Sequence, residues 1–333
     1  MALLEVTDLH TAFFTPAGQV QAVNGVSFTL DRGQTLGIVG ESGSGKSVTA
    51  YSILNILEKT GRITSGSVKL NGQELVGAGE SVMKKIRGDR ISIIFQDPMT
   101  SLNPTYTIGH QLTEGIRLHT SRAPKQAYDR AVEMLTLVGV NEPAKRMKQY
   151  PHQLSGGMRQ RVMIAMALSC EPDILIADEP TTALDVTIQA QILELMKKLQ
   201  KEMGMAIIMI THDLGVVAQM CDRVMVMYAG SVCEQGSVED IFYNPKHAYT
   251  RGLLRSVPTL DSDGALHPIA GSPVNLLQLP EGCPFAPRCE EAMKICVKKR
   301  CALTAAGEGH ATACWLHIKK ELESGGENGR KSH

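Results

Sequence analysis

The sequence predicts an α/β fold, a mostly parallel β-sheet with helices on both faces, and three observations support this. The octet at residues 40–47, Gly-Glu-Ser-Gly-Ser-Gly-Lys-Ser, stands between a short apolar run and a segment that can open as a helix. Further apolar runs recur after it, with a helical pattern between them. The composition, 43% hydrophobic and 20% charged over 333 residues, is that of a globular protein. Strands and helices that alternate in this way are typical of a buried parallel sheet.

The N-terminal part predicts a small antiparallel β-layer beside the main sheet. Residues 2–9 and 20–30 alternate between apolar and polar as strands do, and residues 31–33, Asp-Arg-Gly, form a turn after them. The apolar run at residues 35–39 suits a buried strand that leads into the octet, and residues 48–57 can continue as a helix.

The middle of the chain predicts a helical subdomain inserted between strands. Residues 67–72 read as a strand and turn, and residues 91–95 as an apolar strand. A helical subdomain is then expected at about residues 97–165, because helical spacing is seen in segments such as 127–138 and 158–169.

The β-pattern resumes after this insert and ends before the C-terminal part. Apolar runs at residues 174–177, 206–210 and 224–227 predict strands, and a helix is expected at residues 188–203. After about residue 256 the periodic signal fades into Pro-, Gly- and Cys-containing sequence. We therefore expect three parts, which are a domain at residues 1–255, a small Cys-rich C-terminal extension at 256–320 and a flexible tail at 321–333.

The octet matches G-x-x-x-x-G-K-[ST], a loop whose backbone N–H groups surround phosphates at the start of a helix. In such a loop Lys46 reaches the β- and γ-phosphates and Ser47 binds Mg²⁺. The motif predicts nucleotide binding. The residues that we expect to contact the nucleotide here are Gly40, Ser42, Gly43, Ser44, Gly45, Lys46, Ser47 and Val48.

Two adjacent carboxylates follow a later apolar strand. Residues 174–177 lead directly into Asp178 and Glu179. Hydrolysis requires a second acid at the metal and a group that orients water, so we expect Asp178 to hold Mg²⁺ and Glu179 to polarise the attacking water.

A third motif narrows the class of protein. The stretch Leu154-Ser-Gly-Gly-Met-Arg-Gln-Arg161 lies between the octet and Asp178, and it resembles the signature motif of ATP-binding cassette (ABC) ATPases. The resemblance implies a P-loop ATPase core whose two ATP molecules are sandwiched in a head-to-tail dimer. Ser155, Gly156 and Gly157 would then contact the nucleotide held by the other subunit.

Single positions also match this family, and the resemblance implies their roles. Gln96 resembles the Q-loop glutamine, which senses Mg²⁺ and the attacking water, and His212 resembles the switch histidine at the γ-phosphate. Asp185 belongs to a stretch similar to the D-loop, which crosses the dimer interface. Phe13 is expected to stack on adenine, with Phe14 as the alternative. Val48 departs from the family, where many relatives carry threonine.

Longer stretches resemble the importers of dipeptides, oligopeptides and nickel, and most closely the D-type ATPase of dipeptide importers. These stretches are residues 96–104, 150–157, 177–191, 247–254 and 282–289. The resemblance implies an ATPase motor for peptide uptake, with nickel or another small solute as the alternative substrate. It also implies a second homologous ATPase or a self-dimer, two transmembrane permease subunits and an external binding protein.

The C-terminal cysteines form a separate candidate site. Cys283, Cys289, Cys296 and Cys314 lie on irregular sequence, with Cys301 as an extra thiol. In a reducing compartment such thiolates ligate metal more often than they form disulfides. Relatives with this spacing carry a [4Fe–4S] cluster, so we expect one here, with Zn²⁺ or unliganded thiols as alternatives.

Charge and hydropathy bear on the location of the chain. Lys plus Arg and Asp plus Glu are each 34, which gives no electrostatic case for a nucleic acid partner. No segment approaches the length of a membrane-spanning helix, and Glu5 stands where a signal peptide would carry a base. We expect a peripheral protein at the cytoplasmic side of the cell membrane. A soluble ABC ATPase that acts on DNA or ribosomes is the less favoured alternative.

Overall fold

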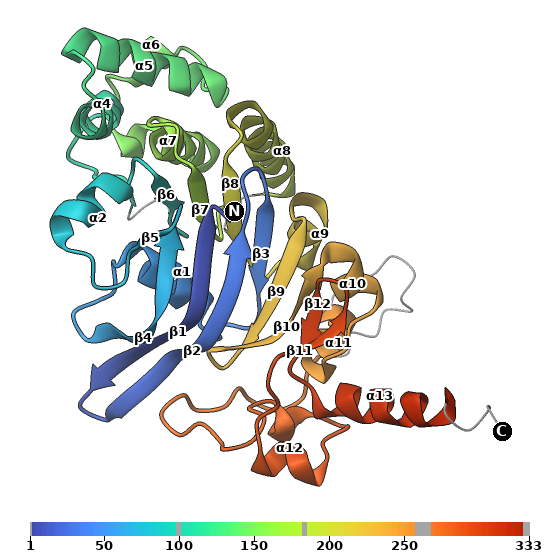
Figure 1. The fold of residues 1–333 in the computed structure, drawn as a ribbon. Coiled ribbons are helices and arrows are strands. Elements are labelled where there is room, and N and C mark those ends of the chain that lie inside the picture. Colours follow the sequence, from blue (N-terminus) through green and yellow to red (C-terminus); the bar gives the residue numbers. More distant parts are fainter. Residues whose placement is uncertain (1, 98–100, 182–184, 257–267, 329–333) are drawn as a thin grey trace. The chain divides into compact units, whose positions relative to one another are not determined.

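The computed structural model describes residues 2–97, 101–181, 185–256 and 268–328 (Figure 1). The chain forms two compact units, whose segments alternate along the sequence. The first unit contains Met1–Leu4, Leu30–Thr35 and Leu70–Thr211. The second contains Glu5–Thr29, Leu36–Lys69 and His212–His333. The predicted boundaries at residues 255 and 320 are not tested by this division and stay predictions.

The first unit contains a parallel sheet segment in the order β6, β7, β8. In the pairing register, Ile93 of β6 lies beside Ile176 of β7, and Ile176 lies beside Ile208 of β8. Every residue of β7 and β8 is buried, which explains why these strands read as continuous apolar runs rather than alternating ones. The strands of this unit are β5 (Gln73–Glu74), β6 (Ile91–Ile94), β7 (Ile174–Asp178) and β8 (Ala206–Ile210).

Helices fill the described chain between β6 and β7, as the periodicity predicts. The three longer helices bury apolar residues, such as Leu112 of α4 and Met134 of α5, whereas the four-residue α6 buries none. The helices of the first unit are α2 (Glu80–Ile86), α4 (Ile108–His119), α5 (Pro124–Leu137), α6 (Pro143–Arg146), α7 (Gly156–Leu168) and α8 (Val186–Met203), with a 3₁₀ turn η1 (Pro151–Gln153).

The second unit contains two groups of strands. Strands β2, β1 and β4 are neighbours in one sheet. In the other, β3 pairs in parallel with β9, and β10, β12 and β11 continue it with antiparallel pairings. The predicted α/β class with a parallel core and a smaller β-layer is confirmed. These strands are β1 (Leu4–Thr15), β2 (Gly18–Leu30), β3 (Thr35–Val39), β4 (Gly61–Leu70), β9 (Arg223–Tyr228), β10 (Ser231–Ser237), β11 (Thr304–Gly307) and β12 (His310–Thr312).

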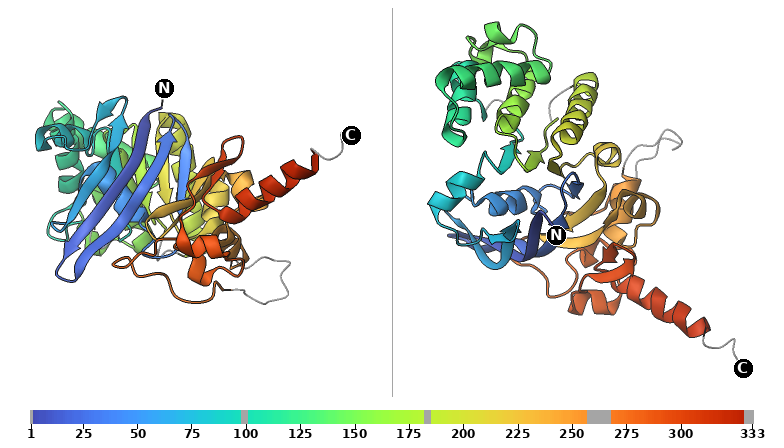
Figure 2. Two further views of the ribbon diagram at one scale, coloured as in Figure 1. Left: turned by 60° about the horizontal axis from the view of Figure 1, so that its bottom comes forward. Right: turned by 45° about the horizontal axis from the view of Figure 1, so that its top comes forward.

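A helix ends the described chain, and the flexible tail expected at residues 321–333 stays a prediction. Helix α13 (Trp315–Asn328) continues to residue 328, and Figure 2 shows it extending from the hairpin of β11 and β12. The remaining helices of this unit are α1 (Lys46–Leu54), α9 (Leu214–Met220), α10 (Val238–Tyr243), α11 (Ala248–Arg255) and α12 (Lys294–Lys298), with a 3₁₀ turn η2 (Ala286–Arg288).

Three buried aromatic rings join the strands of the second unit to the sequence that follows them. The ring centroids of Tyr228, Tyr249 and Phe285 lie 4.7 to 5.4 Å apart. Tyr228 ends β9, Tyr249 is in α11 and Phe285 precedes η2. Tilted aromatic pairs at this spacing contribute about 0.5 to 1.5 kcal/mol each beyond the burial of their area. The triad therefore fixes the start of the Cys-rich segment against β9.

Candidate nucleotide-binding site

The loop between β3 and α1 has a backbone that two glycines permit. Gly40 has φ 151°, and a Cβ there would lie 2.2 Å from the Met227 carbonyl oxygen. Gly45 has φ 98°, and a Cβ there would lie 2.4 Å from the Ala22 carbonyl oxygen. Both positions thus require glycine for space as well as for conformation. The loop then enters α1 at Lys46, two residues earlier than the sequence suggested.

Polar side chains in this loop are arranged as an anion site requires. The Lys46 ammonium is buried and donates hydrogen bonds to the carbonyl oxygens of Gly40 (2.8 Å) and Glu41 (3.0 Å). The Ser44 hydroxyl is buried and has no hydrogen-bond partner among the described residues. Buried polar groups are normally paired, so the unsatisfied hydroxyl fits a phosphate that enters the loop. Ser47 and Val48 follow in the first turn of α1.

The predicted hydrolytic residues of the first unit come together at the end of β7. Asp178 is the last residue of that strand and is buried. Glu179 has φ 48°, a conformation that non-glycine residues seldom adopt, and its N–H donates to the Ile210 carbonyl oxygen (2.8 Å). The Gln96 amide donates to the Glu179 carboxylate at 2.9 Å. The structure therefore brings Gln96 and Glu179 into direct contact although 83 positions separate them.

The signature stretch begins a helix. Ser155 is exposed at the N-cap of α7, and its hydroxyl accepts a long hydrogen bond, 3.4 Å, from the Met158 N–H. Gly156 is exposed and has no atom near a built Cβ, whereas a Cβ at Gly157 would lie 3.1 Å from the Ile188 methyl carbon. Asp185 caps α8 by accepting from the Ile188 N–H (2.9 Å). Of the D-loop stretch, residues 182–184 lie outside the described residues.

His212 and the two candidate aromatic residues belong to the second unit. His212 is exposed just before α9. Phe13 is half-buried, and its ring lies against Gly61, where a Cβ would come within 2.8 Å. Phe14 is 47% exposed, with the Arg62 guanidinium 6.0 Å from its ring centroid. Both rings remain candidates for adenine stacking.

Four of the C-terminal cysteines line one small cavity. Cys283, Cys289, Cys296 and Cys314 border a space of about 20 Å³. Burial raises the pKa of the Cys289 thiol and raises that of Cys283 to about 11. Among the described residues, however, no group of three or more His, Cys, Asp or Glu side chains is arranged to hold a metal ion. The geometry thus does not support the expected [4Fe–4S] cluster or its Zn²⁺ alternative.

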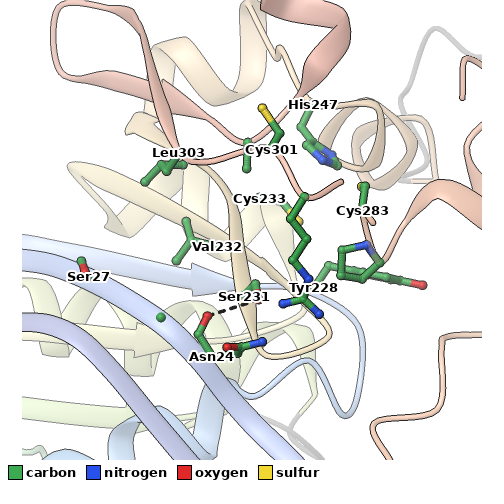
Figure 3. Close-up of a pocket in the computed structure, with 14 residues that line it drawn as sticks. Asn24, Ser27, Tyr228, Ser231, Val232, Cys233, His247, Cys283, Cys301 and Leu303 are labelled. Carbon is green, nitrogen blue, oxygen red and sulfur yellow. Dashed lines mark hydrogen bonds between the residues drawn. The ribbon is translucent and has the colours of Figure 1, made fainter. Parts of the chain in front are cut away.

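Cys301 borders a different and larger cavity, of about 360 Å³, in the second unit (Figure 3). Cys233 and Cys283 also line it, together with His247 and Arg300. Burial lowers the pKa of His247 to about 4, so this imidazole is neutral near pH 7. The octet does not contribute to this cavity.

Contacts that the sequence did not reveal surround Glu41, the second residue of the octet. The Tyr249 hydroxyl accepts from the Glu41 N–H (2.8 Å), and Arg288 donates to both oxygens of the Glu41 carboxylate (2.6 and 2.9 Å). Glu41 occupies a position that the motif leaves free, and Arg288 lies 247 residues away, so no local pattern could have paired them.

The loop, the acidic strand end and the capped signature helix together define the class of an ATP-binding cassette. Comparison with protein families agrees, because residues 23–182 match the family "ABC transporter" and residues 233–296 match "Oligopeptide/dipeptide transporter, C-terminal region".

Relatives named as peptide transport ATP-binding proteins match almost the whole chain. The oligopeptide transport ATP-binding protein OppD of Salmonella typhimurium is 55% identical over 321 residues, which cover 96% of this chain and 95% of that protein. The dipeptide transport ATP-binding protein DppD of Bacillus subtilis is 55% identical over 320 residues, 96% of each chain. This chain belongs to the ATP-binding proteins of ABC transporters, in the oligopeptide/dipeptide group, which are ATPases coupled to transport.

Solved structures show the same fold. A dimeric bacterial ABC transporter cassette is similar with a TM-score of 0.64 and 28% identity, covering 71% of this chain and 98% of that one. A subunit of an ABC transporter complex from Clostridium perfringens has a TM-score of 0.62 and 29% identity, covering 73% and 91%. Within the described residues, no helix is both long and apolar enough to cross a bilayer.

Proposed function

We propose that this chain is the ATP-hydrolysing motor subunit of an importer that takes up dipeptides and oligopeptides. The similarity to oligopeptide and dipeptide transport ATP-binding proteins supports this substrate class, because it extends through the C-terminal region as well as the cassette. The observation that carries the ATPase assignment is the loop at residues 40–47, with a buried Lys46 and an unsatisfied buried Ser44 hydroxyl.

The nucleotide would be held by the loop and by the start of α1. The N–H groups of residues 42–48 would bind the phosphates, and the Lys46 ammonium would exchange its two carbonyl partners for phosphate oxygens. The adenine would stack on Phe13 or Phe14. Binding thus uses side chains and backbone groups that the second unit holds in place.

Hydrolysis would use the carboxylates of the first unit. Mg²⁺ would neutralise charge on the phosphates, with Ser47, Asp178 and Gln96 as its protein ligands. Glu179 would accept a proton from the attacking water, and the Gln96 amide at 2.9 Å would hold the Glu179 carboxylate in position. His212 would contact the γ-phosphate.

Two cassettes would complete each site. Ser155, Gly156 and Gly157 would contact the nucleotide of a partner subunit, and Asp185 would lie near the dimer interface. The exposure of Ser155 and Gly156, with free space beside Gly156, supports a role toward another molecule. The partner would be a second homologous ATPase or another copy of this chain.

The dimer would act beneath two permease subunits at the cytoplasmic face of the cell membrane, with an external binding protein that delivers the peptide. ATP-driven closure and hydrolysis-driven opening would move the permeases. No iron or zinc has a step in this proposal, since the described cysteines do not form a metal-binding group.

Two substitutions test the proposal on the full chain. Lys46→Ala should abolish ATP binding, because the loop loses the cation that meets the phosphates. Glu179→Gln should bind ATP as the unaltered chain does but hydrolyse it about 10²- to 10⁴-fold more slowly, the usual loss when a general base is removed. Calorimetric titration with MgATP and phosphate release measure the two effects.

Peptide uptake provides the second readout. Both variants should stop uptake of a labelled dipeptide by cells that depend on this transporter. Unchanged uptake with Glu179→Gln would show that the chain is not the motor, and unchanged uptake of dipeptide but loss of another solute would overturn the substrate class.

A further inference from the structure

Glu41 is held at all three of its polar groups. Its N–H donates to the Tyr249 hydroxyl at 2.8 Å, and its carbonyl oxygen accepts from Lys46 at 3.0 Å. Its carboxylate accepts two hydrogen bonds from Arg288, of 2.6 and 2.9 Å. Two of these three anchors, Tyr249 and Arg288, lie in the region that matches the transporter C-terminal family and not the cassette family.

The Arg288 side chain is fully engaged in this contact. It is 5% exposed and all three guanidinium nitrogens donate. Nε bonds the Ala270 carbonyl (2.9 Å), Nη2 also bonds the Ile269 carbonyl (3.2 Å), and Nη1 lies 3.3 Å from the Tyr228 hydroxyl. A planar guanidinium with five N–H donors suits such a bidentate and multiply bonded position, and a lysine cannot reproduce it.

The C-terminal segment also packs beside the loop itself. Residues of the octet line a small cavity of about 20 Å³ together with Pro273, Val274 and Leu276 of the C-terminal segment and with Tyr228 and Ala229. The octet residues at this cavity are Glu41, Ser42, Gly43 and Ser44. Four successive octet residues therefore face the same small space as the C-terminal segment, in addition to the ion pair of Glu41 with Arg288.

The anchors differ in what they do when a nucleotide arrives. Lys46 must release the Gly40 and Glu41 carbonyls in order to reach phosphate, so its hold on the loop is lost at binding. Tyr249 and Arg288 have no such competing role. A loop that is already held in its binding conformation loses less conformational entropy on binding, which strengthens affinity without a new contact to the ligand.

We propose that Arg288 is a positioning residue that preorganises the phosphate loop through Glu41, so that the C-terminal extension sets the affinity of the cassette for MgATP. This inference rests on the proposed function of the loop and extends it to a residue outside the cassette. It assigns a role in nucleotide binding to the segment between Cys283 and Cys289.

The test is the Arg288→Gln variant of the full chain, titrated with MgATP. The Kd should rise about tenfold, the scale of one lost charge-assisted contact. KM for hydrolysis should rise in parallel, while kcat at saturating ATP should stay within about twofold, because the catalytic carboxylates are untouched. The Kd of Arg288→Lys should lie between that of the unaltered chain and that of Arg288→Gln, since lysine keeps the charge but not the paired geometry.

A second variant and a matched control separate positioning from general stability. Glu41→Gln should reproduce the rise in Kd, and the double variant should be no weaker than either single one, because both act through one contact. Arg251→Gln removes another partly buried arginine of the same region, which pairs with Glu291 instead of the loop. It should leave the Kd unchanged.

Each outcome decides the inference. An unchanged Kd in both Arg288→Gln and Glu41→Gln overturns it, as does an equal rise with Arg251→Gln or additive losses in the double variant. If Arg288→Gln does not fold, Glu41→Gln and the control carry the decision. Lys46→Ala in the same titration keeps the two proposals apart, because binding that survives Lys46→Ala refutes the nucleotide site itself.

Discussion

At the scale of single residues, the phosphate loop depends on two glycines, Gly40 and Gly45, because they have no Cβ. Gly40 and Gly45 leave room for neighbouring carbonyl oxygens at 2.2 and 2.4 Å from where a Cβ would stand. The Lys46 ammonium donates to the Gly40 and Glu41 carbonyl oxygens of the loop, and the Ser44 hydroxyl stays unsatisfied. The spacing of the motif predicts these residue types, and the backbone geometry gives the physical reason for them.

Two glycine substitutions distinguish the effect of a steric clash from the effect of a strained backbone conformation. Gly40→Ala should lower the free energy of unfolding by more than about 3 kcal/mol, since it combines a strained φ with a clash against backbone. Gly43→Ala, at φ 75° with no atom within 4 Å, should cost only about 1 to 2 kcal/mol. Urea denaturation of both variants measures the difference, and equal losses would contradict the clash.

At the scale of elements, one carboxylate connects two turns of the first unit. Asp173, just before β7, pairs with Arg32 at 2.8 Å and with Arg90, which precedes β6. Burial alone would raise the pKa of Asp173, but the hydrogen bonds from Arg32 and Arg90 outweigh burial and hold it below its usual range. The ionised carboxylate is therefore the form that the fold stabilises.

The pH dependence of stability follows from the lowered pKa of Asp173. The contribution of Asp173 to stability should be complete above the ordinary carboxyl pKa of about 4 and should be lost as the pH falls through the lowered value. Asp173→Asn should therefore lower the free energy of unfolding by about 1 to 2 kcal/mol at pH 7, with a smaller loss near pH 2. Denaturation at the two pH values measures this.

The matched control is Asp129→Asn, an exposed carboxylate on α5. It should leave the free energy of unfolding within about 0.5 kcal/mol of the unaltered chain at both pH values. A loss with Asp173→Asn that is the same at pH 7 and pH 2 would mean that the ionised form has no special role.

The short strands and long-range contacts of the C-terminal segment could not be predicted from sequence patterns. Strands β11 and β12 are four and three residues long, too short for a visible alternation, yet β12 pairs with β10 and extends its sheet. Glu234 of β10 accepts hydrogen bonds from the Lys246 and His247 N–H groups and pairs with His310 of β12 at 2.7 Å. These contacts span 12 to 76 positions and have no local signal.

At the scale of the whole molecule, the proposed function gives this chain half of each composite ATP site. Ser155 is exposed at the start of α7, and a similar bacterial cassette has a dimeric structure. If the signature stretch acts on the nucleotide of a partner subunit, ATP hydrolysis must depend on association of two subunits. ATP binding must then be independent of that association.

The Ser155→Arg variant distinguishes ATP binding from ATP hydrolysis that depends on association. The bulky cation should block approach of the partner, so steady-state ATP hydrolysis should fall at least about tenfold while the Kd for ATP stays within about twofold. Light scattering in MgATP should show no dimer, whereas Glu179→Gln should associate. Hydrolysis by Ser155→Arg at the unaltered rate would exclude a role of the signature in a partner's site.

The sequence by itself determined the α/β class, the phosphate loop and the acidic strand end, because these depend on local spacing and on hydrophobic period. It also predicted Gln96 and Glu179 as site residues, although their contact at 2.9 Å required the structure. Only the tertiary structure decided that Arg288 and Tyr249 hold Glu41. It also decided that four of the five C-terminal cysteines border one cavity without forming a metal-binding group in the described residues. The physical reason is that folding brings together side chains far apart in the chain, and neither propensity nor motif spacing records which of them will meet.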